Sequence, residues 1–165
     1  MKTMKKLMLC GALLGAFLGL PAVAQDKPKE KAAVPAGDVK TAAYKLGSVV
    51  DESLALNGLD GKKLSFKDLR GKVVLIHFWS TQCPYETVAD PKFVELEKRW
   101  KDQKDVVILA INANSSEIGE APPADGYAAI RAHAKEKGLT HQIVADHGNK
   151  LADLFQAKST PHCFV

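Results

Sequence analysis

Cysteine is scarce in this chain of 165 residues, which contains only Cys10, Cys83 and Cys163. So few cysteines exclude the dense disulfide framework that stabilises many small exported domains. A Cys-x-x-Cys pair is also missing, because Glu86 stands where the second cysteine would follow Cys83. Chemistry at Cys83 must therefore proceed without the neighbouring thiol that closes the internal disulfide of such a pair.

A hydrophobic run long enough to cross a membrane is missing near the N-terminus. Residues 7–20 form an apolar run of about 14 residues, whereas a membrane-spanning helix needs about 20. Lysines within residues 2–6 precede this run, and Ala-Val-Ala at residues 22–24 follows it, an order typical of a cleaved secretory signal. We therefore predict that residues 1–24 are a signal peptide and that the mature protein is periplasmic or secreted. It would meet the membrane only in transit; an uncleaved anchor is the alternative.

A strong net charge is missing from the expected mature chain. The formal charge of +4 includes the lysines of the predicted signal peptide, and their removal leaves about +1. This balance argues against a nucleic-acid-binding protein. Residues 25–45 combine Lys, Ala and Pro without apolar periodicity, so we expect a disordered linker there.

A set of histidines with metal-ligand spacing is missing as well. The histidines of the C-terminal third are scattered along the chain: His133, His141, His147 and His162. Unpatterned histidines are more often surface or core residues than ligands. We therefore predict no metal and no other cofactor, with copper held by Cys83 and His162 as the alternative considered.

What the sequence does contain is an alternation of strand-like and helix-like segments. Residues 73–79 (VVLIHFW) and 106–111 (VVILAI) are nearly continuous apolar runs, typical of strands buried on both faces of a sheet. Further expected elements are a hairpin of residues 53–56 and 63–66, helices from Pro84 onward, at 124–137 and at 150–156, and strands at 143–144 and 162–165. This order indicates an α/β fold with helices on a central sheet. Residues 114–124 form a longer connection than such a fold needs, which favours a functional or mobile loop.

Cys83 has a position that favours reactivity. It follows the expected strand that ends at Trp79 and directly precedes Pro84. Proline is tolerated at the first helical position, so we expect Cys83 to be the N-cap of a helix. Free N–H groups and the positive end of the helix dipole would then favour the thiolate. The sequence therefore makes Cys83 a candidate nucleophile.

The motif FWSTQCPYE at residues 78–86, with Thr160-Pro161 further along the chain, resembles the thioredoxin-like superfamily. More narrowly, residues 46–72 (LGSVVDESLALNGLDGKKLSFKDLRGK) and 146–165 (DHGNKLADLFQAKSTPHCFV) are similar to the redoxin group, which includes the AhpC/TSA proteins. The resemblance implies a thioredoxin-like α/β fold over residues 46–165, a central mixed sheet flanked by helices. It also implies that Pro161 is cis and packs against Cys83. The family fold has a further strand and helix, so we expect a domain truncated at its C-terminus.

Two residues near Cys83 depart from the family pattern. Glu86 replaces the second cysteine, and its carboxylate could reach back to the N–H of Cys83 in a capping box while opposing the helix dipole. His77 stands where the family often carries Asp or Asn. On an alternating strand it shares a face with Leu75 and Trp79. His77 is then either a proton relay for Cys83 or a buried, hydrogen-bonded histidine.

A peroxidase resembling the peroxiredoxins is a lesser alternative. Ser80 stands where those proteins carry Thr, but Ile76 replaces the proline that opens their motif. Residues 160–162 (Thr-Pro-His) occupy the strand on which their peroxide-binding arginine lies. Without that arginine, the charge that develops during O–O cleavage loses an electrostatic partner.

Cys163 is the one candidate in the expected mature chain for a cysteine that resolves Cys83. It lies two residues beyond Pro161, hence on the same strand face and about 6.6 Å further along. A disulfide needs Cα atoms within about 7 Å, so an internal bridge is conceivable. A buried apolar cysteine is the commoner outcome at such a position, and a structural disulfide is a further alternative.

The predicted function is that of an exported single-cysteine thiol oxidoreductase. Cys83 would attack a disulfide or a peroxide, and an external thiol or a thioredoxin-like reductant would resolve the product. Pro84 would set the start of the helix, and Thr160 and Pro161 would present their backbone to the substrate. The substrate groove would be shaped by Trp79 and Tyr85. The alternative from another class is a redox-silent binding module with the same fold.

Overall fold

The computed structural model describes residues 43–165. The predicted signal peptide, with Cys10, and most of the predicted linker lie outside the described residues. Within the described residues the helices are Glu86–Trp100 (α1), Ser115–Ile118 (α2), Ala128–Glu136 (α3) and Lys150–Phe155 (α4), with 3-10 turns at Phe66–Leu69 (η1) and His147–Asn149 (η2). The strands are Ala55–Gly58 (β1), Lys63–Ser65 (β2), Val73–Phe78 (β3), Val106–Asn112 (β4), Gln142–Ala145 (β5) and His162–Phe164 (β6).

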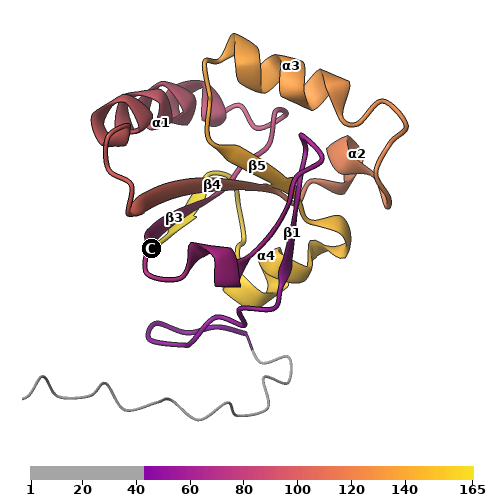
Figure 1. The fold of residues 1–165 in the computed structure, drawn as a ribbon. Coiled ribbons are helices and arrows are strands. Elements are labelled where there is room, and N and C mark those ends of the chain that lie inside the picture. The colour runs from indigo at the N-terminus through magenta and orange to yellow at the C-terminus, as the bar shows by residue number, and fades with distance from the viewer. Residues whose placement is uncertain (1–42) are drawn as a thin grey trace, which may run out of the picture. The chain divides into compact units, whose positions relative to one another are not determined.

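The strands form one mixed sheet in the order β2-β1-β5-β4-β3-β6. Strands β3, β4 and β5 run parallel, whereas β1 pairs antiparallel with β5 and β6 pairs antiparallel with β3. The apolar runs predicted as buried strands are thus the central pair, β3 and β4. Helices α1 and α3 lie on one side of this sheet and α4 lies on the other (Figure 1).

Alternation along β4 divides its side chains between two apolar layers. Ile108 and Ala110 pack with residues of α1 and α3, while Leu109 and Ile111 pack with residues of α4 and η1. Successive side chains of a strand point to opposite faces, so one apolar run supplies both layers. This arrangement confirms the predicted α/β fold of a central mixed sheet flanked by helices.

Two predicted helix starts were wrong for local reasons. The helix predicted from Pro84 begins at Glu86, because the preceding residues make i to i+3 turns. The helix predicted from residue 124 begins at Ala128, because Gly126 and Tyr127 have positive φ angles of 61° and 63°. The long connection over residues 114–124 contains a short helix, α2, which starts where the Asn114 side chain accepts the N–H of Ser116.

None of the helices in residues 43–165 is both long and apolar enough to cross a membrane.

Candidate functional site

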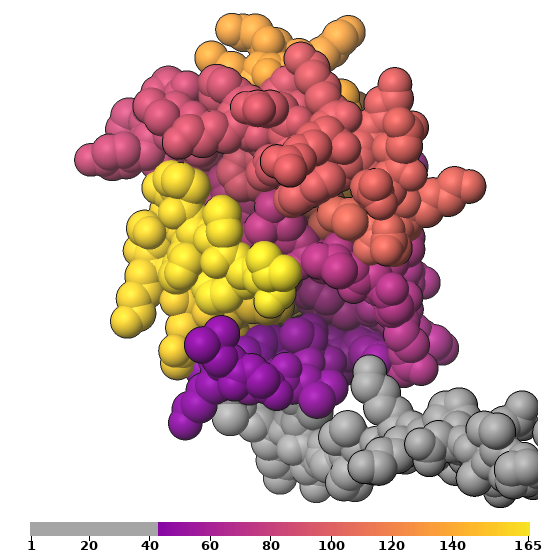
Figure 2. Space-filling view, turned by 90° about the vertical axis from the view of Figure 1, so that its left-hand side faces the viewer, coloured from indigo at the N-terminus to yellow at the C-terminus, as the bar shows by residue number. Residues whose placement is uncertain are grey.

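Cys83 lies beyond the end of β3, in the turn that leads into α1. Its half-buried thiol is 3.0 Å from the carbonyl oxygen of Thr160, and in that contact the sulfur donates. The Thr160–Pro161 peptide bond is cis. The structure thus brings Cys83 together with the Thr-Pro segment that lies almost eighty residues further along the chain. Figure 2 shows the C-terminal residues (yellow) at the surface next to the segment that contains α1 (pink).

Helix α1 starts later in the chain than predicted, so Cys83 is not its N-cap. Cys83 donates its N–H to Ser80 and accepts the N–H of Glu86, at N···O distances of 3.2 and 3.1 Å. The N-cap is Tyr85, not Cys83, and Glu86 is the first helical residue. These turns place Cys83 one turn before the regular helix, so the dipole acts on its sulfur from a greater distance than an N-cap position implies.

Glu86 turns inward instead of forming the predicted capping box. Its side chain is 3% exposed, and Oε2 lies 3.2 Å from Nε2 of the fully buried His77. His77 stacks on Phe93 of α1, with ring centroids 3.8 Å apart. Burial raises the pKa of the Glu86 carboxyl; the contact with His77 opposes this rise, and the nearby charge of Asp90 adds to it. The position of the usual second cysteine is therefore held by a buried carboxyl group paired with a histidine.

His77 lies on the face of β3 that the sequence predicted. Leu75 and Trp79 pack in the same layer, beneath α1. Nε2 of His77 lies 3.2 Å from the Glu86 carboxylate, and the alternative of a buried, hydrogen-bonded histidine stays a prediction. Whether it relays protons for Cys83 stays a prediction.

Trp79 does not line a substrate groove, contrary to the prediction. It is 0% exposed, and its indole N–H donates to Oδ1 of Asp90 at 2.9 Å. The prediction was wrong because Trp79 lies one residue beyond β3 and still points into the layer under α1. Tyr85, by contrast, is 72% exposed beside the cysteine, which leaves its groove role open.

A second buried histidine–carboxylate pair extends this polar cluster. Nδ1 of His141 contacts Glu97, whose carboxylate also accepts the N–H groups of Thr140 and His141. Burial lowers the pKa of His141, and the charge of Glu97 opposes that shift. Among the described residues, every buried side-chain nitrogen or oxygen without a hydrogen-bond partner belongs to His77, Glu86, Asp90 or His141.

Cys163 is exposed and free, so the expectation of a buried apolar cysteine was wrong. It lies on β6, which is an edge strand of the sheet. Its register partner in the antiparallel ladder is His77, so the two side chains share a face. Although the residue is exposed, neighbouring atoms shield its thiol partly from water, which raises the pKa of Cys163. The charge of Glu86 raises this pKa further. Cys83 and Cys163 are not joined in a disulfide, and the role of Cys163 as a resolving cysteine stays a prediction.

Glu117 belongs to the site, although the sequence did not suggest it. From α2 its carboxylate accepts the backbone N–H groups of Thr81 and Gln82, at 3.1 and 2.9 Å, and the hydroxyl of Ser80. These three residues lead directly into Cys83. The one available signal was the length of the connection over residues 114–124, which identified the segment but not the residue.

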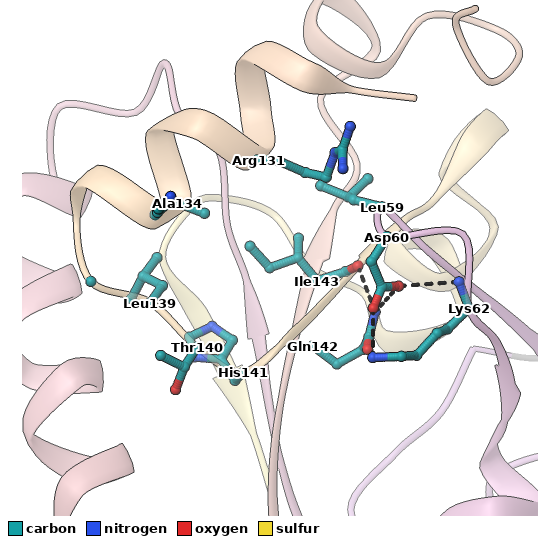
Figure 3. Close-up of a pocket in the computed structure, with 12 residues that line it drawn as sticks. Leu59, Asp60, Lys62, Arg131, Ala134, Leu139, Thr140, His141, Gln142 and Ile143 are labelled. Atoms are coloured by element: carbon teal, nitrogen blue, oxygen red, sulfur yellow. Dashed lines mark hydrogen bonds and ion pairs between the residues drawn. The ribbon is translucent and has the colours of Figure 1, made fainter. Parts of the chain in front are cut away.

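A separate hollow of about 330 Å³ lies away from Cys83 (Figure 3). It opens between α3 and the start of β5, whereas Cys83 follows the end of the parallel strand β3, so the two lie at opposite ends of these strands. Its wall carries the ion pair of Asp60 with Lys62, at 2.8 Å. No three His, Cys, Asp or Glu side chains within residues 43–165 are grouped so that they could hold a metal ion.

A mixed sheet with a cysteine after its central strand and a cis-proline facing that cysteine defines a thioredoxin-like protein. The comparisons agree with this class. The crystal structure of StoA from Bacillus subtilis shares the fold, with a TM-score of 0.54 and 21% sequence identity over 67% of this chain and 76% of that one.

Residues 49–165 match the AhpC/TSA family, and the chain belongs to that family. It is 29% identical over 113 residues to the thiol-disulfide oxidoreductase ResA of Bacillus cereus, covering 68% of this chain and 59% of that protein. It is 31% identical over 111 residues to the thioredoxin-like protein YneN of Bacillus subtilis, covering 67% of this chain and 59% of that protein. The chain thus spans about three-fifths of the length of these curated relatives.

Proposed function

We propose that this protein is an exported thiol-disulfide oxidoreductase that acts through the single cysteine Cys83. The observation that carries the proposal is the half-buried thiol of Cys83, 3.0 Å from the carbonyl oxygen of Thr160 and beside a cis-proline. The similarity to the thiol-disulfide oxidoreductase ResA of Bacillus cereus supports the reaction class. The signal-like residues 1–24 support export.

The reaction would begin with loss of the thiol proton of Cys83. The thiolate attacks one sulfur of a substrate disulfide, RSSR, and forms the mixed disulfide Cys83–S–S–R. The S–S bond of the substrate breaks, and the leaving thiolate RS⁻ takes up a proton to become RSH. The Thr160 carbonyl and Pro161 would border the sulfur on the side where the substrate chain lies.

Resolution would come from outside the chain, because Glu86 occupies the position of a second active-site cysteine. An external thiol R′SH, small or carried by a thioredoxin-like reductant, attacks the R sulfur of the mixed disulfide as its thiolate and forms R′S–SR. The S–S bond to Cys83 breaks, and the departing Cys83 thiolate takes up a proton to become the thiol again. The Glu86–His77 pair beneath the site would accept or return the proton in these steps. Cys163 is an internal alternative as the resolving thiol, and its raised pKa means that it needs a base to lose its proton.

Trapping of the mixed disulfide tests this proposal. The expected mature chain, without residues 1–24 and therefore without Cys10, carries Cys163→Ser and is treated at neutral pH with an excess of a small disulfide; the adduct is measured by intact-mass spectrometry. We expect one adduct, located on Cys83, and none in the Cys83→Ser, Cys163→Ser control.

Absence of an adduct with every small disulfide tried would overturn the proposal. An oxidised product formed with hydroperoxides alone would move the function to the peroxidase alternative. Reaction with neither reagent would favour the redox-silent binding module.

A further inference from the structure

The Glu117 carboxylate connects two segments that are far apart in the chain. On one side it binds the residues that precede Cys83, namely Ser80, Thr81 and Gln82. On the other side it accepts the side-chain amides of Asn112, at 2.7 Å, and Asn114, at 3.1 Å. These are five donors, more than the about four lone-pair sites of a carboxylate, so Glu117 has no accepting capacity left.

The charge state of Glu117 suits this role. Burial alone would raise its pKa, but the hydrogen bonds from Ser80, Asn112 and the two backbone N–H groups outweigh burial and hold the pKa below its usual range. Glu117 is therefore ionised at neutral pH. Hydrogen bonds to an ionised acceptor are stronger than neutral ones, so the segment over residues 80–82 is firmly held.

The restraint reaches the reactive sulfur through a short path. The carbonyl oxygen of Ser80 accepts the backbone N–H of Cys83 at 3.2 Å. The Ser80 side chain is 3% exposed and is fixed by Glu117 at its hydroxyl. Holding Ser80 therefore fixes the backbone of Cys83, and with it the direction of the thiol toward Thr160.

We propose that Glu117 is a positioning residue for Cys83. It holds residues 80–82 so that the sulfur faces the Thr160–Pro161 segment, the alignment that a peptide disulfide needs in order to react. A small alkylating reagent can approach the sulfur from any open side and does not need this alignment. This inference rests on the proposed function and adds the requirement that the substrate disulfide lies in an extended chain along residues 160–161.

The test compares two rate constants for Cys83 in the Cys163→Ser background: reaction with a peptide disulfide and alkylation by iodoacetamide. Glu117→Gln keeps the length of the side chain but turns an NH₂ group toward N–H donors. We expect the ratio of the peptide rate to the alkylation rate to fall about tenfold or more, because small misplacements of reacting atoms cost large factors in rate. Glu120→Gln is the matched control: it removes one carboxylate from the same exposed connection, and we expect the ratio to stay unchanged.

Hydrogen exchange of the Thr81 and Gln82 amides gives a readout that is independent of thiol reactivity. We expect faster exchange in Glu117→Gln and not in Glu120→Gln. If Glu117→Gln fails to fold, Ser80→Ala removes one of the contacts with no change of charge, and we expect the ratio to fall in the same direction by a smaller factor.

An unchanged ratio in a folded Glu117→Gln protein would overturn the positioning role and leave the proposed function intact. A wild-type protein that does not react with the peptide disulfide would overturn the proposed function, and amide exchange would then decide whether Glu117 restrains the segment. If the rate falls equally with both reagents, Glu117 has only a general structural role, and the inference fails.

Discussion

The face of the sheet beneath α4 is filled by apolar and aromatic side chains, whereas the face beneath α1 holds titratable groups among its apolar ones. On the α4 side, Phe155 contacts the rings of Phe66, Phe78 and Phe164. On the α1 side, the fully buried His77 and Glu86 lie among equally buried apolar neighbours. A single sheet thus has two covering layers of different composition.

The difference shows which layer contains groups that lower the stability of the fold. A buried polar group without a partner costs about 1–3 kcal/mol. In residues 43–165 the buried side-chain atoms outside hydrogen-bond geometry belong to His77, Glu86, Asp90 and His141, and the ion pair of His77 with Glu86 offsets part of this cost. Cys163 pairs with His77 across the ladder, and Cys83 precedes Glu86 by one turn. These polar groups therefore lie near both thiols, whereas the buried apolar cluster on the α4 side contains none of them.

The largest expected effect tests that apolar side. Phe155 is 8% exposed and packs against several aromatic rings. Phe155→Ala should lower the free energy of unfolding by about 3–5 kcal/mol, because it removes a large buried ring and leaves a cavity. Urea unfolding followed by circular dichroism measures this change. The exposed Val165→Ala is the control and should shift stability by less than about 0.5 kcal/mol. A loss below about 1 kcal/mol for Phe155→Ala would contradict the assigned role of this layer.

The next prediction concerns the polar side, where replacing both members of a buried pair should preserve or raise the stability of the fold. His77→Leu alone leaves the Glu86 carboxyl buried without its partner and should destabilise the protein by about 1–3 kcal/mol. The double variant His77→Leu, Glu86→Met replaces the pair with apolar side chains, and it should be as stable as wild type or more stable by about 1–4 kcal/mol. Urea unfolding of wild type, single and double variants forms the test. A double variant less stable than wild type would contradict this prediction and show that the pair stabilises the fold.

The pH dependence of stability should separate Glu86 from Glu117. Burial raises the pKa of Glu86, and Glu86 faces His77, Asp90 and Cys163. Its folded form keeps a proton that the unfolded chain loses, so its contribution to stability is lost as pH rises from the unfolded pKa through the folded one. Hydrogen bonds hold the pKa of Glu117 low, so its contribution is lost as pH falls through the folded value.

The measurement is the free energy of unfolding as a function of pH for wild type, Glu86→Gln and Glu117→Gln. We expect Glu86→Gln to remove a loss of stability above the usual pKa of a glutamate, and Glu117→Gln to remove a loss below it. Glu120→Gln should follow the wild-type curve. Changes of the same sign in both variants would contradict the opposite environments assigned to the two carboxyls.

The smallest effect is expected far from both layers, at the hollow in Figure 3. Asp60 pairs with Lys62 on the surface, and that hydrogen bond is the main cause that lowers the pKa of Asp60 to about 2. Exposed ion pairs contribute little, so Asp60→Asn should change the free energy of unfolding by less than about 1 kcal/mol at neutral pH. Urea unfolding in low and high salt checks this. A larger or salt-independent loss would show that Asp60 acts mainly by holding Gln142, which donates to it at 3.0 Å.

Most of the fold was predictable because its signals are local. The apolar runs over residues 73–79 and 106–111 became the central strands β3 and β4, within one residue at each end. The second hairpin strand and the late strand β6 lie within one residue of the prediction, whereas β1 lies two residues later than the predicted 53–56. Helix starts were less predictable, since Pro84 permits a helix without requiring one and positive φ angles at Gly126 and Tyr127 delay another.

By itself the sequence determined which chemistry is available: one cysteine before a proline, a Thr-Pro pair later in the chain, and a glutamate where a second thiol is usual. Tertiary structure alone decided that Trp79 is buried, that Cys163 is exposed beside His77, and that Glu117 holds the residues before Cys83. The physical reason is the distance along the chain over which each kind of signal acts. Periodicity and turn residues act over a few positions, whereas these contacts join residues that are 11 or more positions apart. Only the packing of helices on the sheet and the pairing of β3 with β6 bring them together.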